Sequence, residues 1–170
     1  MREKAILVVS FGTSYQGTRE RTIGAIEKRI QGEFPESKVY RAFTSEYIKK
    51  KLEKQGTHIP DIKEALSQII GEGRTNQLIV QPTYIINGTE YKKVQQEIMP
   101  YLEQFREVRF GSPLLSRTID YKKLADILKL MKENAVDMSK QGEAYPCHNT
   151  GVLHYTGQQI SDALEGILKA

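Results

Sequence analysis

The sequence predicts an α/β fold: a doubly wound, mostly parallel sheet of four to five strands with helices on both faces. Short apolar runs alternate with longer amphipathic segments along the chain, which is the pattern of repeated βα units. Two of the runs, Leu7–Val9 and Leu78–Val80, also end abruptly in small or hydroxylated residues. Ligands bind outside the carboxyl ends of the strands in open α/β sheets, so both runs indicate a cleft at that edge.

The first half of the chain reads as two strand–helix units. A strand ending at Val9 leads through a polar loop to a helix over 18–34, and Pro35 marks its end. The isoleucines of this helix recur at helical spacing, at Ile23, Ile26 and Ile30. A second strand over 38–43 is followed by a helix to Glu53, capped by Ser45. We expect its inner face to hold Tyr47, Ile48 and Leu52.

The pattern continues in the second half. Pro60 and Asp61 open a helix over 62–70, which ends at the glycines that follow. A third strand is expected over 77–81, then a helix over 90–105 that is interrupted or bent near Pro100. A short fourth strand over 108–110 precedes a helix over 119–131.

The pattern weakens after Asn134. A fifth strand would fall at 143–148, but Pro146 makes that segment unsuitable for the centre of a sheet. An amphipathic helix is expected over 158–168. We therefore divide the chain into an α/β domain, residues 1–134, and a divergent tail, residues 135–170.

Composition excludes several classes of protein. With 27% charged and 39% hydrophobic residues in 170, the chain is typical of one globular domain. No apolar run approaches the ~20 residues of a membrane span, and the first strand begins too early to leave room for a signal peptide. The single cysteine, Cys147, forms no internal disulfide. We therefore expect a cytoplasmic protein that does not bind membranes. We also expect no binding to nucleic acid, because the basic residues behind the net charge of +4 are scattered along the chain.

Few residues are candidates for chemistry. The loop after the first strand, with Ser10, Thr13 and Ser14, either binds carboxylates or phosphates or simply caps its own helix. Glu90 begins a helix, where a carboxylate either complements the helix dipole or transfers protons. His148 follows the fifth-strand segment, as a base, a metal ligand or a solvated turn residue. His58 is expected at the surface.

Five segments together resemble one family. They are Val8–Ser14 with Thr18 and Arg19, Arg41–Ser45, Gln81–Thr83, Ile85–Gly88 with Glu90 and Tyr91, and Gly111–Ser116. In this order they resemble the anaerobic-type sirohydrochlorin cobaltochelatases of the class II chelatases. The resemblance runs from about Lys4 to about Leu130.

The resemblance implies insertion of Co²⁺ into a sirohydrochlorin-type tetrapyrrole in cobalamin biosynthesis, without ATP or a prosthetic group. Tetrapyrrole and divalent metal are then the substrates. It implies that Glu90 and His148 are catalytic and that His148 also binds the metal. The residues implied to line the macrocycle are Ser10, Phe11, Gly12, Thr13, Ser14, Thr83, Tyr84, Asn87 and Gly88. Arg19 and Arg41 are suited to the acid groups of such a substrate.

Two departures from the family pattern stand out. Tyr84 replaces the usual histidine of the segment before Asn87, which argues against a metal role at this position. Around His148, only the histidine and Thr150 match the family's Met-Gly-His-Gly-Thr segment, and the family's second half has no counterpart. We expect a shortened family member that forms a homo-oligomer to enclose the macrocycle. The alternatives are a non-catalytic half-domain that binds tetrapyrrole or metal, and a flavodoxin-like interaction module.

Overall fold

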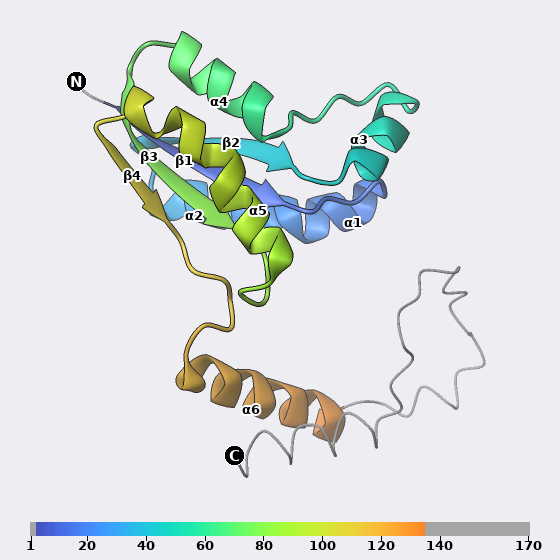
Figure 1. Ribbon diagram of the computed structural model, residues 1–170. Helices are drawn as coiled ribbons and strands as arrows, with labels where there is room; N and C mark the ends of the chain where they lie inside the picture. The colour runs from blue at the N-terminus through green and yellow to red at the C-terminus, as the bar shows by residue number, and fades with distance from the viewer. Residues whose placement is uncertain (1–2, 135–170) are drawn as a thin grey trace. The chain divides into compact units, whose positions relative to one another are not determined.

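The computed structural model describes residues 3–134, which form four parallel strands and their connecting helices (Figure 1). The strands are β1 (Glu3–Ser10), β2 (Ser37–Phe43), β3 (Thr75–Pro82) and β4 (Glu107–Phe110). Their order in the sheet is β2-β1-β3-β4 and every neighbouring pair is parallel, so the predicted fold class is confirmed. The chain leaves β1 for one side of the sheet and later returns to the other, which makes the β1/β3 boundary the topological switch point.

The helices confirm most of the predicted elements. They are α1 (Gln16–Arg21), α2 (Ile23–Glu33), α3 (Glu46–Glu53), α4 (Ile62–Gly71), α5 (Thr89–Ile98) and α6 (Thr118–Asn134). A 3₁₀ helix, η1 (Met99–Gln104), continues α5 beyond the bend expected at Pro100. The chain divides into two units at Ser116/Arg117, and α6 belongs to the second unit. The segment 143–148 and the helix expected over 158–168 lie outside the described residues.

The core lies on both faces of the sheet. Strand β1 alternates its side chains between the two faces, and Ala5–Val9 are all at most 2% exposed. Helices α4 and α5 cover one face, with Leu66, Ile69 and Val94 in the main cluster, while α1 and α2 lie behind the other (Figure 1). A strand buried on both faces reads as a continuous apolar run, which is why β1 was recognisable in the sequence.

Two details of the prediction were wrong. The helix expected over 18–34 is two helices separated at Thr22, whose hydroxyl donates to the Thr18 carbonyl and whose backbone leaves the helical region. As α2 restarts at Ile23, that residue is buried while Ile26 is 43% exposed. In α3, Tyr47 is exposed because Lys49 and Leu52 occupy the buried side.

Candidate functional site

The loops that follow β1, β2 and β3 are joined by hydrogen bonds at the carboxyl edge of the sheet. The Thr83 hydroxyl donates to the Ser10 hydroxyl over 2.8 Å, and the Thr83 N–H bonds the Val9 carbonyl at 2.9 Å. On the other side of β1, the Thr44 N–H bonds the Ser10 carbonyl at 3.0 Å. Ser10 is 1% exposed, so its hydroxyl holds the loops together and does not face a ligand.

The loop after β1 has a shape that only glycine adopts easily. Gly12 has a φ of +100°, and the chain turns there between exposed Phe11 and the buried Ser14. The helix that follows, α1, has Tyr15 at its N-cap position, and the side chain of Tyr15 forms no capping hydrogen bond. The N-cap residue therefore does not support the alternative that this loop caps its own helix. One side-chain bond does lie just before the helix, where the Thr13 hydroxyl accepts the Tyr15 N–H at 3.3 Å.

Tyr84 crosses from β3 to the loop after β2. Its hydroxyl and that of Thr44 are 2.8 Å apart and share a hydrogen bond. Burial raises the pKa of Tyr84, and the nearby Glu90 raises it further, against the opposing effect of the Thr44 bond. Tyr84 therefore stays protonated at neutral pH and acts as a hydrogen-bonding group.

Glu90 stands in the first turn of α5, directly after Asn87 and Gly88. Its carboxylate forms an ion pair with Lys93 at 2.7 Å, and its side chain remains 41% exposed. Gly88 occupies the N-cap position without a side-chain cap, and Asn87 is exposed. Glu90 thus lies at the predicted edge, close enough for its charge to act on Tyr84, and its carboxylate is accessible to a ligand.

The fourth strand adds its own loop to this edge. The N–H groups of Leu114 and Leu115 bond the carbonyls of Tyr84 and Ile85, at 3.0 and 2.7 Å. The Tyr91 hydroxyl donates to the Gly111 carbonyl at 3.2 Å, and Tyr91 is itself buried. Tyr91 is consequently a core residue that supports the loop, while the segment 85–88 is held from below with its side chains outward.

Apolar side chains protrude from these loops. Six large hydrophobic residues after the strands or at the start of the next helix are more than half exposed: Phe11, Tyr15, Tyr47, Ile85, Ile86 and Leu114. Phe34, Met99 and Ile127 are equally exposed elsewhere. Beside Thr44, a cavity of about 370 Å³ is walled in part by three carboxylates, Glu46, Asp61 and Glu97. The edge therefore combines apolar surface with ionised groups.

The sequence analysis did not single out one residue of this edge, and the structure does not test another residue that it did single out. Thr44 links both Ser10 and Tyr84, and its signal was available, because it is a hydroxylated residue directly after β2, as Ser10 is at the end of β1. His148 lies outside the described residues. Within residues 3–134, no three histidine, cysteine or acidic side chains are grouped closely enough to hold a metal ion. His58 is exposed as expected, with Glu53 and Glu64 near its ring.

No helix in the described part of the chain combines the length and apolar character needed to cross a bilayer.

Comparison with known proteins gives the family. The family model for cobalt chelatase (CbiK) matches residues 4–159. The sirohydrochlorin cobaltochelatase of Salmonella typhimurium is 38% identical over 128 residues, which are 75% of this chain and 48% of that protein. The sirohydrochlorin cobaltochelatase CbiKC of Nitratidesulfovibrio vulgaris is 30% identical over 131 residues, which are 75% of this chain and 45% of that protein.

The chain thus spans about half the length of the curated relatives it matches. The family match covers the β1–β4 sheet except Glu3, and all the loops described above. On this evidence, the chain belongs to the cobalt chelatase (CbiK) family.

Proposed function

We propose that the protein inserts Co²⁺ into a sirohydrochlorin-type tetrapyrrole in cobalamin biosynthesis, as a metal chelatase (a lyase) that uses neither ATP nor a prosthetic group. Family membership and the names of both relatives support this activity. The structural observation that carries it is the set of exposed apolar side chains on the loops at one edge of the sheet. A monomeric protein seldom exposes such groups together without a binding role.

A tetrapyrrole matches this edge in shape and chemistry. Its ring is flat and apolar, so Phe11, Ile85 and Ile86 can pack against its face. Its periphery carries carboxylates, which need cationic or N–H donors. Gly12 lets the loop after β1 turn tightly over Phe43, which leaves Phe11 exposed for contact with the ring.

Metal insertion requires that two pyrrole N–H protons leave as the divalent ion enters. We assign proton acceptance to Glu90, whose carboxylate is accessible, and to His148, which the family resemblance implies as base and metal ligand. Tyr84 is protonated and positions the loop with Thr44.

A macrocycle also needs a second wall. Because the described sheet presents its loops on one edge, we propose that a second copy supplies that wall, in a cytoplasmic homo-oligomer. Two copies related by a two-fold axis present the same surface to each other, which is the commonest arrangement of oligomers.

The test is an absorbance assay of metal insertion. Metal-free sirohydrochlorin and Co²⁺ are mixed with the purified full chain, and the spectral change is compared with a protein-free blank. We expect the wild type to accelerate insertion and His148→Ala to lose about 100-fold or more in rate, the scale of a lost general base. His58→Ala, which alters an exposed histidine, is the matched control and keeps the wild-type rate. A wild-type rate equal to that of the blank refutes the proposal.

A second candidate function is a non-catalytic half-domain that binds tetrapyrrole or metal. The observation in its favour is that residues 3–134 contain no group of three metal-ligating side chains. The same assay separates the two functions, because a half-domain changes the sirohydrochlorin spectrum on binding but does not accelerate insertion. An interaction module would change neither.

A further inference from the structure

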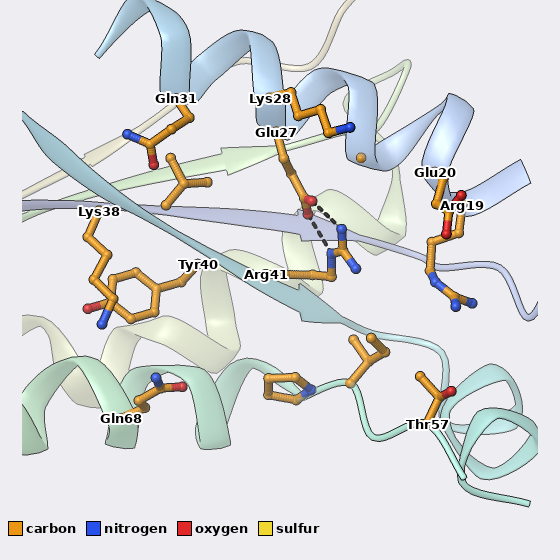
Figure 2. A pocket seen from close by; sticks show the side chains of 14 residues that line it. Arg19, Glu20, Glu27, Lys28, Gln31, Lys38, Tyr40, Arg41, Thr57 and Gln68 are labelled. Carbon is orange, nitrogen blue, oxygen red and sulfur yellow. Dashed lines mark hydrogen bonds and ion pairs between the residues drawn. The ribbon is translucent and has the colours of Figure 1, made fainter. Parts of the chain in front are cut away.

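A groove runs along the outer edge of β2, the terminal strand of the sheet (Figure 2). Its volume is about 720 Å³. One wall consists of α1 and α2, the floor is β2 over 38–41, and the opposite wall is the loop 57–60 with Gln68 of α4. Four cationic side chains line it: Arg19, Lys28, Lys38 and Arg41.

Two of these cations are already neutralised. The Arg41 guanidinium contacts both carboxylate oxygens of Glu27, with the Nε–Oε1 bond at 2.7 Å and a second, shorter bond (Figure 2). The Lys38 ammonium lies 2.7 and 2.8 Å from the two oxygens of Glu72. A third, Lys28, belongs to an exposed stretch of α2, where water solvates its charge.

Arg19 is different. It is only 9% exposed, yet within residues 3–134 it forms no ion pair. Among the described residues, its side chain makes one hydrogen bond, from Nη1 to the Thr13 carbonyl at 3.3 Å. In Figure 2 it lies beyond the end of β2, at the mouth of the groove nearest the loops of the carboxyl edge.

The Arg19 guanidinium has donors to spare. An arginine side chain carries five N–H groups, and those that protein oxygens do not accept need water or a ligand as partner. Among the described residues, no buried side-chain nitrogen or oxygen lacks a hydrogen-bond partner, so the remaining N–H groups of Arg19 keep contact with solvent in the groove. They form a planar set of donors that suits the two oxygens of a carboxylate.

We infer that Arg19 binds a carboxylate at the mouth of the β2 groove, and that this carboxylate is an acid side chain of the tetrapyrrole. The inference rests on the proposed function. Its connection to that function is Thr13, whose carbonyl accepts the Arg19 bond and which belongs to the loop assigned to the macrocycle. A ring held against this loop directs a peripheral acid group into the groove, where a carboxylate replaces solvent as the partner of the free guanidinium donors.

The test measures binding of metal-free sirohydrochlorin to three variants of the full chain. Arg19→Gln removes the charge, and we expect it to raise Kd about 10- to 100-fold, the effect of one lost charge-assisted bond. Arg19→Lys keeps the charge without the planar donors and recovers only part of the affinity. Arg21→Gln is the matched control: Arg21 is an exposed residue of the same helix, bonded to the Gly17 carbonyl at 3.1 Å, and its Kd stays within about twofold of wild type.

Inorganic phosphate separates a tetrapyrrole site from a general anion site. If wild type binds no sirohydrochlorin, the proposed function fails, and phosphate then tests the arginine alone. A phosphate-dependent rise in Tm in wild type and Arg21→Gln, but not in Arg19→Gln, supports an anion site for a free ion. Equal sirohydrochlorin affinities for the Arg19 and Arg21 variants, or no Arg19-dependent effect of either ligand, overturn the inference. If Arg19→Gln fails to fold, Arg19→Lys decides, because wild-type affinity in that variant also overturns it.

Discussion

Gly12 is the residue whose backbone shapes the loop after β1. Its φ of +100° lies in a backbone region that residues other than glycine rarely adopt. A Cβ built at this position would lie 2.5 to 3.0 Å from three ring atoms of Phe43, a residue with no exposed surface. The glycine thus lets the loop turn tightly over the end of β2 and present Phe11 outward.

Gly12→Ala is therefore expected to destabilise the protein by about 2 kcal/mol or more, because backbone strain and overpacking against Phe43 add together. Chemical unfolding followed by circular dichroism measures the change. Gly17→Ala is the control, since nothing lies within 4 Å of a Cβ there and the residue is inside α1, so it should be neutral or stabilising by up to about 1 kcal/mol. Equal unfolding midpoints for the two variants would contradict this account.

Tyr84 shows how a departure from a family pattern is accommodated. The family resemblance places a histidine here, but the hydroxyl of Tyr84 bonds Thr44 across β1 and the burial of the ring raises its pKa. A protonated phenol is a poor metal ligand at neutral pH. The residue has a structural role that the sequence alone could not assign, because Thr44 is 40 positions away.

At the scale of elements, Asp61 connects two helices. Its side chain accepts the Glu64 N–H at 2.8 Å while Glu64 bonds back to the Asp61 N–H, which forms a capping box at the start of α4. Asp61 also accepts from Lys49 of α3 at 3.1 Å. Burial by itself would raise the pKa of Asp61, but these bonds outweigh it and lower the pKa below its ordinary value of 3.8.

Asp61→Ala should cost about 1 kcal/mol at neutral pH, mainly through the lost cap. Because the folded state lowers the pKa of this carboxyl, its contribution is complete above about pH 4 and disappears as the pH falls through the folded value. Urea unfolding from pH 7 to pH 3 should show wild type and variant converging in the acidic range.

The control for this pH series is Glu36→Ala, which removes an exposed carboxylate from the loop before β2. It should leave the unfolding free energy within about 0.5 kcal/mol of wild type across the range. A difference between Asp61→Ala and wild type that stays constant down to pH 3 would show that the carboxylate charge contributes nothing.

At the scale of the whole molecule, the proposed function makes the stoichiometry of binding informative. A single sheet edge covers one face of a macrocycle, so two chains are expected to bind one sirohydrochlorin. Sedimentation velocity at increasing sirohydrochlorin should show the monomer converting to a dimer, with saturation at about one ligand per two chains. A species of one chain with one tightly bound sirohydrochlorin would mean that one copy is sufficient.

The sequence predicted the elements better than their junctions. All four strands and the bend at Pro100 were recognisable, because two-sided burial and proline act locally. The break at Thr22 was not, since the isoleucine spacing on either side of it is compatible with one helix. The exposure of Tyr47 was not predictable either, because it depends on which face of α3 packs against the rest of the protein, and only tertiary structure sets that.

For the site, the sequence by itself determined which loops carry polar and apolar groups to the carboxyl edge, because strand ends and loop composition are local properties. Only the tertiary structure decided how those residues are used. It buried Ser10 as a link to Thr83, paired Glu90 with Lys93 and Arg41 with Glu27, and left Arg19 without an anion among the described residues. Hydrogen bonds and ion pairs join residues far apart in the chain, and whether a charge is paired or free depends on distances that only folding sets.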